Sequence, residues 1–309
     1  MIGFVARRLI AGAGVLWVVA TLTFALLRFL PGGPFDKEKT LPPEILRNLE
    51  RRYALDGTVA EQYFDYLGRV LKGDLGPSYK YPGRDVREIL FDALPVSVEL
   101  GLLALAIAIA GGIALGLAAG TRRGTALDRS VAWLSLVGVS APSFVIGAGL
   151  ILVVGLWLDW LPAGLWEGPR HAILPALTLA ALPLAYVTQL TRAQVVAVMG
   201  QDFVRTARAK GVPESRLRRL HVLRNALLAV STYFGPLLAT LLTGSFVVEK
   251  IYAIPGMGRF FVTAVTNRDY PLVLGVTLVY AVLVVLANLA VDLLYAWLDP
   301  RIRVSGDDG

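Results

Sequence analysis

The chain contains no cysteine among its 309 residues. It can therefore form neither a disulfide nor a thiolate-ligated metal site, and it lacks a cysteine nucleophile. Histidine is nearly absent too, since only His171 and His221 occur and no His-Glu-x-x-His pattern is present. No serine is paired with a neighbouring histidine, and no pair of carboxylates suggests a catalytic cleft. We therefore expect no metal site and no enzymatic centre on this chain.

Charged residues are also scarce, at 17% of the sequence, whereas apolar residues make up 56% and the mean hydropathy is +0.63. These values are typical of an integral membrane protein rather than a soluble domain. The net charge of +7 does not indicate nucleic acid as a partner, because the basic residues cluster beside apolar runs instead of covering one polar face. Membrane topology explains that charge more simply.

Six apolar stretches are long enough to cross a bilayer, which takes about 20 residues because lipid offers the backbone no hydrogen-bond partners. The first stretch exceeds the apolar core of a cleaved signal peptide, and no clear cleavage site follows, so we expect it to be retained. The sequence thus predicts an all-α membrane protein with six transmembrane helices. They span Leu9–Leu30, Leu94–Ala119, Val131–Leu158, Ala172–Leu190, Ala226–Val248 and Leu272–Leu298.

The distribution of lysine and arginine predicts the orientation of these helices. The loop Asp202–Arg224 carries seven basic residues against two acidic ones, whereas the long segment Pro31–Ala93 is balanced, with ten basic and eleven acidic residues. The basic segments all fall on one side of a six-span arrangement, so both termini are predicted to be cytoplasmic. Besides the loop, these segments contain Arg7 and Arg8, then Arg122, Arg123 and Arg129, and finally Arg301 and Arg303.

The segment Pro31–Ala93 shows helical patterning. Pro42-Pro43-Glu44 opens a stretch with Ile45, Leu49 and Tyr53 at i, i+4 spacing, and a second apolar stripe runs from Tyr63 to Leu71. Lys72 to Pro77 then contains helix-breaking residues. We interpret the segment as a small helical cap outside the membrane, which either packs over the mouth of the bundle or contacts a soluble delivery protein.

Several predicted spans contain helix breakers. A proline in a spanning helix frees a carbonyl and permits a kink, which an alternating-access protein can use as a bending point, although prolines also occur in inert membrane helices. Both interpretations stay open here. The residues concerned are Gly138 and Pro142 in the third span, Pro175 and Pro183 in the fourth, and Gly235-Pro236 in the fifth.

The sequence offers little to power transport by itself. It has no Gly-x-x-x-x-Gly-Lys-Ser/Thr loop for nucleotide phosphates. An ion-driven carrier normally keeps ionisable groups at mid-membrane, where each costs ~2.5–3.5 kcal/mol on insertion scales. Here Asp292, Glu99 and Arg28 all lie near the ends of their spans. We therefore favour a structural role for Asp292, with a partner for its carboxylate. A secondary carrier in which Asp292 is the titrating group is the alternative.

The basic loop between the fourth and fifth spans has a recognisable local pattern. Helix-forming residues lead up to Gly211, and Pro213 with Glu214 resembles the first turn of a new helix. We expect a short helix, a sharp turn and a second helix, stiff enough for a bound protein to pull on the bundle. A loop that only sets topology is the alternative that its charge alone would favour.

This loop resembles the Glu-Ala-Ala motif of importer permeases of the ABC class. That pattern consists of Glu-Ala-Ala, three residues, Gly, nine residues and Ile-x-Leu-Pro. With its Gly on Gly211, only Ala207, Gly211 and Leu223 match the general form, and Arg205 stands in place of the glutamate. The run Arg-Thr-Ala-Arg-Ala-Lys-Gly is similar to the variant carried by B-type subunits of the oligopeptide, dipeptide and nickel permease group. The resemblance implies that this loop binds an ATPase subunit and transmits its conformational change to the membrane helices. The residues concerned are Arg205, Thr206, Ala207, Arg208, Lys210, Gly211, Val212 and Pro213.

The resemblance covers nearly the whole chain and is closest to the oligopeptide branch of that group, on the basis of the extracytoplasmic stretch. Importers of dipeptides, murein peptides, glutathione or nickel share the same fold and are alternatives. The matching segments are the N-terminal Arg-Arg, Pro31–Phe35, Thr40–Glu44, Gly73–Ser78, Ile254–Gly258, Asn267–Tyr270 and Asp299–Arg303.

The resemblance implies a type-1 importer permease fold and a multi-pass location in a bacterial inner membrane. The expected division is residues 1–30 for the first span, 31–93 for the extracytoplasmic helical segment, 94–298 for the five-helix transmembrane domain and 299–309 for a cytoplasmic tail. The partners implied are a C-type permease, two ATPase subunits, an extracytoplasmic peptide-binding protein, lipid and a peptide substrate. The chain itself needs no cofactor, because ATP and Mg would bind the ATPase subunits.

The lining of the substrate pathway is the least determined feature, since peptides vary in side chain and offer mainly their backbone for recognition. Candidates are Ser140, Gln189, Thr243 and Ser245, in the third to fifth spans. For each of these polar residues, ordinary hydrogen bonding between helices is the favoured explanation.

Overall fold

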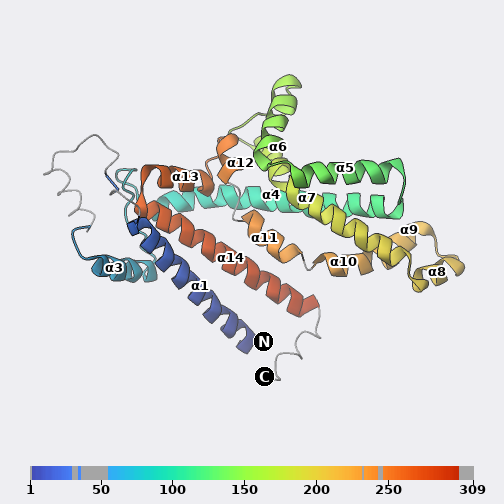
Figure 1. Cartoon of the computed structure of the whole chain (residues 1–309), viewed down its shortest axis with the longest axis horizontal. Coiled ribbons are helices and arrows are strands. Elements are labelled where there is room, and N and C mark those ends of the chain that lie inside the picture. Colours follow the sequence, from blue (N-terminus) through green and yellow to red (C-terminus); the bar gives the residue numbers. More distant parts are fainter. Residues whose placement is uncertain (1, 30–33, 36–54, 232, 243–245, 299–309) are drawn as a thin grey trace. The chain divides into compact units, whose positions relative to one another are not determined.

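The computed structural model describes residues 2–29, 34–35, 55–231, 233–242 and 246–298. These residues are helical or irregular and contain no β-strand, apart from one isolated antiparallel bridge between Pro77 and Asp85 (Figure 1). The chain divides into two units, one of residues 1–96 with 256–285 and the other of residues 97–255 with 286–309.

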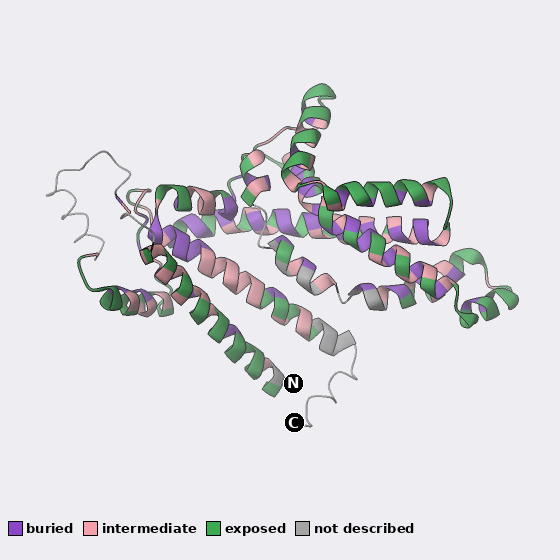
Figure 2. Ribbon diagram, viewed as in Figure 1, coloured by how far each residue is buried: buried purple, intermediate pink, exposed green. Residues whose placement is uncertain are grey.

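The first unit contains α1 (Ile2–Phe29), α3 (Val59–Leu71), α13 (Met257–Asn267), the first turns of α4 (Val86–Thr121) and most of α14 (Tyr270–Leu298). Its core joins one face of α4 to α13 and α14, through residues such as Ile89, Met257 and Leu272. Helix α1 is exposed over most of its length (Figure 2), as expected of a helix that faces lipid.

Helix α3 confirms the helical stripe predicted between Tyr63 and Leu71. A capping box sets its start, because Thr58 Oγ1 accepts from the Glu61 amide at 3.3 Å and the Glu61 carboxylate accepts from the Thr58 amide at 2.7 Å. The predicted helix around Ile45, Leu49 and Tyr53 lies outside the described residues.

A loop from Asp74 to Asp85 is fastened to the start of α14 by Asp269. This fully buried carboxylate accepts from the Ser78 hydroxyl, from the Tyr79 amide at 3.1 Å and from the Lys80 amide at 3.3 Å. It also caps α14, because it accepts from the Leu272 amide at 3.4 Å. Two sequence segments that were singled out separately, Gly73–Ser78 and Asn267–Tyr270, therefore form one structural joint.

The second unit contains the rest of α4 and the helices up to residue 251. In chain order these are α5 (Ala126–Ser140), α6 (Ser143–Leu150), the π-helical segment η1 (Ile151–Trp157), α7 (Pro169–Met199), α8 (Asp202–Ala209), α9 (Glu214–Arg216), the π-helical segment η2 (Leu217–Leu223), α10 (Arg224–Ser231), α11 (Phe234–Leu242) and α12 (Phe246–Ile251). Its main core packs α4 and α7 against α10 and α11.

Four described helices are long and apolar enough to cross a membrane, within α1, α4, α7 and α14. The third predicted span is broken, because α5 and the α6–η1 arm meet at 114° around Pro142. Counted as one span, this pair gives five. The kink that Pro142 permits is therefore present, whereas Pro175 and Pro183 lie inside an uninterrupted α7. A role of these prolines in alternating access stays a hypothesis.

The fifth predicted span, Ala226–Val248, is described in pieces. It contains α10, α11 and the start of α12, with a turn at Tyr233 between α10 and α11, and residues 232 and 243–245 lie outside the described residues. The apolar pattern identified the stretch but not the turn at Tyr233, because hydropathy does not register where a helix ends. Gly235 and Pro236 lie in the first turn of α11. A proline there costs no hydrogen bond within the helix, because the amides of the first turn have no intrahelical acceptor.

Helices α4 and α7 approach each other closely along a stripe of glycines. A Cβ added at Gly116 would lie 2.6 Å from the Thr188 carbonyl oxygen, and one at Gly112 or Gly120 would lie within 3 Å of a valine side chain of α7. Only glycine permits this contact between the two backbones. The spacing of four residues between these glycines is the signal of close helix packing in membranes, and the sequence interpretation did not use it.

Candidate functional site

The loop Asp202–Arg224 folds as predicted into a short helix, a sharp turn and a second helical segment. Helix α8 ends at Ala209, the chain turns at Gly211, and α9 begins at Glu214 after Pro213 and continues through η2 into α10. The turn is a Schellman motif, because the Gly211 amide donates to the Arg208 carbonyl at 2.9 Å and the Val212 amide donates to the Ala207 carbonyl at 3.2 Å.

Gly211 has a φ of +76°, in the left-handed region that other residues adopt only at a cost. A Cβ at this position would meet nothing within 4 Å. Within this chain the requirement for glycine is therefore conformational rather than steric. The side of the turn at Gly211 is open, and any object that fills it must come from outside the described residues.

We expect Gly211→Val to loosen the turn by about 1–2 kcal/mol, because a left-handed backbone conformation costs that much for a residue with a Cβ. Gly211→Asn should cost less, since asparagine tolerates this conformation. Hydrogen exchange of the Gly211 and Val212 amides measures the effect. Equal exchange protection in the valine variant and the wild type would contradict the role given to the left-handed turn.

The inner face of the loop is apolar and packs on the end of α7. Val204 and Ala207 of α8 and Leu217 and Val222 of η2 are buried against Val195 and Val198 of α7, and Leu117 of α4 packs against the same cluster. The loop is therefore tied to two long helices. A force applied to α8 can reach both of them through packed side chains.

The outer face of the loop is basic. Arg205, Thr206, Arg208, Lys210 and Pro213 are exposed, Val212 is half-buried and Ala207 faces inward, so Ala207 acts through packing rather than by direct contact. Two apolar side chains that the sequence interpretation passed over, Phe203 and Leu220, are 39% and 54% exposed on the same element. Phe203 directly precedes the buried Val204 and therefore lies on another face of α8, whereas Leu220 follows the buried Leu217 by three residues, a spacing that gives no such signal.

An ion pair closes the turn between α8 and α9. Arg208 Nε lies 2.7 Å from Glu214 Oε1, and Arg218 Nε lies 3.8 Å from Glu214 Oε2. The hydrogen bond from Arg208, together with the charges of Arg208 and Arg218, lowers the pKa of Glu214 below its ordinary 4.5. The pair therefore supports the turn above that ordinary value, and the support is lost as the pH falls through the lower folded pKa.

We expect Arg208→Gln to return the pKa of Glu214 towards its ordinary value, because it removes the largest cause of the shift. Arg218→Gln should move the pKa less, since Arg218 lies farther away. An NMR titration of the Glu214 carboxyl carbon in both variants makes the comparison. A larger shift in the Arg218 variant would show that the pairing is assigned wrongly.

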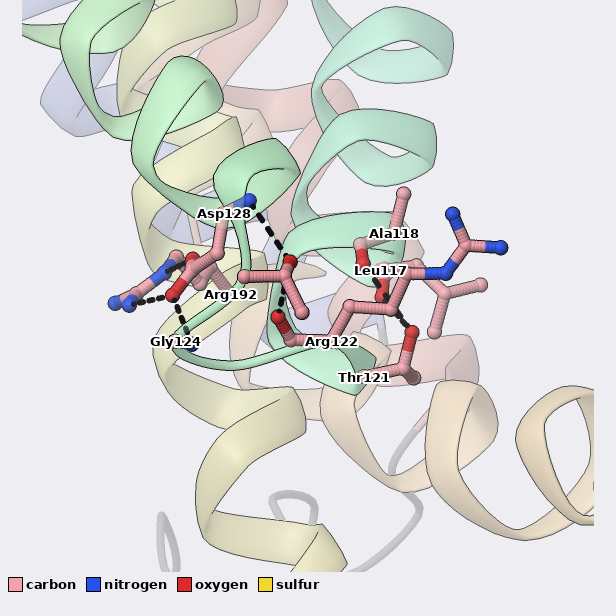
Figure 3. A network of polar contacts seen from close by, with 8 residues as sticks. Leu117, Ala118, Thr121, Arg122, Gly124, Asp128 and Arg192 are labelled. Carbon is pink, nitrogen blue, oxygen red and sulfur yellow. Dashed lines mark hydrogen bonds and ion pairs between the residues drawn. The ribbon is translucent and has the colours of Figure 1, made fainter.

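A second polar network fixes α5 to α7 on the same unit (Figure 3). Asp128 is buried and accepts from Arg192 Nε at 2.5 Å, from a second Arg192 nitrogen at 2.9 Å and from the Gly124 amide at 2.9 Å. Thr125 Oγ1 caps α5 by accepting from the Asp128 amide. Such a two-bond pair fixes geometry as well as charge, so it orients the end of α7 that leads into the loop. The sequence interpretation singled out neither Asp128 nor Arg192.

Two further buried polar contacts lie in the second unit. Ser97 donates to the fully buried Glu249 carboxylate at 2.8 Å. The Tyr252 hydroxyl lies 2.8 Å from Thr178 Oγ1 and 3.2 Å from the Gly147 carbonyl oxygen, so it joins the residue that follows α12 to α7 and α6. These contacts were not predicted, because a single polar residue in an apolar run does not reveal its partner.

The predicted pathway residues are only partly described. Ser140 is the last residue of α5 and Gln189 lies in α7, and both are exposed. Thr243 and Ser245 lie outside the described residues. No metal-binding group of three or more His, Asp or Glu side chains occurs in the part of the chain that the structure describes.

A bundle of apolar helices with a helix-turn-helix packed on the end of a spanning helix defines a membrane permease of the ABC-importer type. Comparison with known families confirms this class. Residues 112–304 match the model described as "Binding-protein-dependent transport system inner membrane component", and residues 1–101 match its N-terminal companion. The chain belongs to this family, with which six spans are consistent, and as a permease it is a transporter rather than an enzyme.

Relatives of similar length align over the whole chain. The dipeptide transport system permease protein DppB of Bacillus subtilis is 42% identical, over 98% of this chain and 99% of its own. The oligopeptide transport system permease protein OppB of Escherichia coli is 40% identical, over 98% of this chain and all of its own. A crystal structure of an amino acid ABC transporter has a TM-score of 0.52 at 18% identity, covering 67% of this chain and 92% of that one, and supports the fold alone.

Proposed function

We propose that this chain is the B-type permease subunit of an ATP-driven peptide importer in a bacterial inner membrane. It would form the translocation path with a C-type permease, receive peptide from an extracytoplasmic binding protein and be driven by two ATPase subunits that bind ATP and Mg. Both termini would be cytoplasmic, which places the basic loop Asp202–Arg224 on the side of the ATPases.

The observation that supports this proposal best is the geometry of that loop. Its apolar face packs on α7 and α4, whereas its basic face is exposed. No described residue covers the side of the turn at Gly211, so another protein can contact this surface. ATPase binding that favours one arrangement of the loop over another would shift the permease between inward-open and outward-open states. The positive charges on this face predict a cleft on the ATPase that is acidic or lined by hydrogen-bond acceptors. They belong to Arg205, Arg208 and Lys210.

The substrate is proposed as a peptide, and two lengths compete. An oligopeptide substrate is supported by the extracytoplasmic sequence pattern and by the similarity to OppB. A dipeptide substrate is supported by the 42% identity to DppB. Uptake into proteoliposomes with peptides of two to eight residues, each competing against a labelled peptide, separates the two lengths. Competition by dipeptides alone would reject the oligopeptide assignment.

Two experiments test the proposal as a whole. Purification of the chain in mild detergent should recover an ATPase and a second permease, identified by mass spectrometry. Uptake should stop on ATP depletion and continue with an uncoupler. The opposite pattern would overturn the ATPase-driven assignment in favour of an ion-driven carrier.

We expect Gly211→Val to abolish ATP-driven uptake, because the strained turn can no longer seat in the ATPase. Gly83→Val is the matched control, since Gly83 has the same φ of +76° and an equally open Cβ position in a different loop. The control variant should keep most of the uptake. Full uptake by the Gly211 variant, with normal membrane insertion, would contradict the docking role.

A further inference from the structure

The first unit contains a cavity of about 130 Å³ that the proposed transport function does not use. It lies where the last turn of α1, the helix α3, the loop after Leu71 and the first turn of α14 meet. Its wall combines apolar and aromatic side chains with two guanidinium groups and one carboxylate. The residues that matter below are Phe24, Arg28, Tyr66, Arg69, Asp74 and Leu274.

Tyr66 leaves an unused hydrogen-bonding group at this cavity. Its ring is buried and stacked on Phe24 with centroids 5.8 Å apart, yet its hydroxyl has no hydrogen-bond partner among the described residues. A buried hydroxyl without a partner costs about 1–3 kcal/mol, so it usually has one in the working molecule. Burial raises the pKa of Tyr66 to about 12, which keeps the phenol protonated and able to donate.

The charges at the cavity favour an anion. Arg69 forms no ion pair or hydrogen bond through its side chain within the described residues, and Arg28 donates to the neutral Gln62 and lies 5.3 Å above the Phe24 ring. The carboxylate of Asp74 accepts from the Gly76 amide. Two cations and one carboxylate leave one positive charge, which a single phosphodiester would neutralise.

The position of the cavity indicates where that anion comes from. Arg28 is the next-to-last residue of the spanning part of α1, and therefore lies at the depth of lipid headgroups. Leu26 and Phe29 on the same turn are 66% and 84% exposed, so this end of α1 is open to lipid chains. Phe24 and Leu274 supply an apolar wall on that side, whereas the polar groups come from α1, α3 and the loop that follows α3.

We propose that this cavity binds the phosphate of a phospholipid headgroup, held by Arg28, Arg69 and the hydroxyl of Tyr66. The orientation proposed above places it in the outer leaflet. The bound lipid would hold α3 on α1 and α14, because its phosphate bridges side chains from α1 and α3 at one point. No part of this assignment depends on the substrate or on the ATPase.

The test uses the full-length chain, purified in detergent, and measures the melting temperature against added phosphatidylglycerol, with native mass spectrometry to count retained lipid. Diacylglycerol with the same acyl chains tests the lipid without its phosphate group. Inorganic phosphate tests the phosphate without the lipid. The variants are Arg69→Gln and Tyr66→Phe, and the control is Arg87→Gln. Arg87 is an exposed arginine of the same unit that lies 5.4 Å above the Phe91 ring, outside the cavity.

Phosphatidylglycerol should raise the melting temperature of the wild type and of the Arg87 control. The lipid concentration for half the effect should rise about tenfold in the Arg69 variant, which loses a charge-assisted bond, and severalfold in the Tyr66 variant. Without lipid, Tyr66→Phe should melt at or above the wild-type temperature, because the change removes a buried hydroxyl that has no partner. Diacylglycerol should have no comparable effect.

Three results would overturn the proposal. They are an equal lipid effect in all four chains, no lipid effect at all, or stabilisation by diacylglycerol as strong as by phosphatidylglycerol. Stabilisation by inorganic phosphate but not by lipid, with the same dependence on Arg69 and Tyr66, would keep phosphate recognition and reject the lipid as its source.

Discussion

Replacing Gly116 with leucine is expected to prevent α4 and α7 from packing, and to leave little folded protein in the membrane. The first added atom, Cβ, would lie 2.6 Å from the Thr188 carbonyl oxygen, 2.6 Å from Thr191 Cβ and 3.0 Å from the Arg192 amide nitrogen. Two of these three atoms belong to the backbone of α7, so no change of rotamer can relieve the clash. Overpacking usually costs about 1–3 kcal/mol, and a clash with backbone should reach or exceed the upper value.

The effect should grow in the order Ala, Val, Leu at position 116, as measured by the yield of monodisperse protein and by its melting temperature. Gly149→Leu is the matched control, because Gly149 is also helical and a Cβ there would meet nothing within 4 Å. We expect this control to melt near the wild-type temperature. A stable Gly116→Leu protein would mean that α4 and α7 do not approach as the structure describes.

Replacing Asp269 with alanine is expected to release the loop Asp74–Asp85 from the start of α14. The change removes the acceptor of the Tyr79 and Leu272 amides and of the Ser78 hydroxyl, and it leaves the Lys80 amide only its second acceptor, Ser78 Oγ. Hydrogen bonds to a charged acceptor contribute about 1.5–3 kcal/mol each, and buried donors left unpaired add to the loss. A total of roughly 3 kcal/mol or more is expected, because the contributions are not additive.

Limited proteolysis within residues 74–85, together with the melting temperature, measures this release. Asp269→Asn keeps one acceptor oxygen and should have an intermediate effect. Asp92→Ala is the control, since Asp92 forms an exposed ion pair with Arg84 that should contribute about 0–1 kcal/mol. If the Asp269 and Asp92 variants proved equally stable, the hydrogen bonds of Asp269 would not be what holds the loop in place.

The features that the sequence predicted correctly depend on residues close together in the chain. The apolar stretches, the sharp turn at Gly211 and the new helix after Pro213 each follow from a window of a few residues, and so does the identification of Pro142 as a position where a helix can kink. Such windows determine backbone conformation and hydropathy, which is why α8, the turn and α9 were found. The turn at Tyr233 within Ala226–Val248 was not predicted, because hydropathy alone does not specify helix ends.

The site was predicted in part for the same reason. Charge and spacing singled out the loop Asp202–Arg224, but they did not show that Ala207 faces α7 or that Phe203 is exposed. The docking role of the loop and the pathway roles of Ser140 and Gln189 stay predictions. The orientation of a side chain on a short helix depends on the helix beneath it, and that neighbour is distant in sequence.

The sequence by itself determined the membrane class, the helical segments, the sharp turn at Gly211 and the resemblance to a family of importer permeases. Only the tertiary structure decided which faces meet: Gly116 with α7, Asp128 with Arg192, Ser97 with Glu249, and Asp269 with Ser78. The physical reason is that apolar helices gain little hydrophobic free energy by choosing one another over lipid. Their pairing is selected by close backbone approach and by polar contacts between residues 64 to 191 positions apart, and neither is encoded in a local pattern.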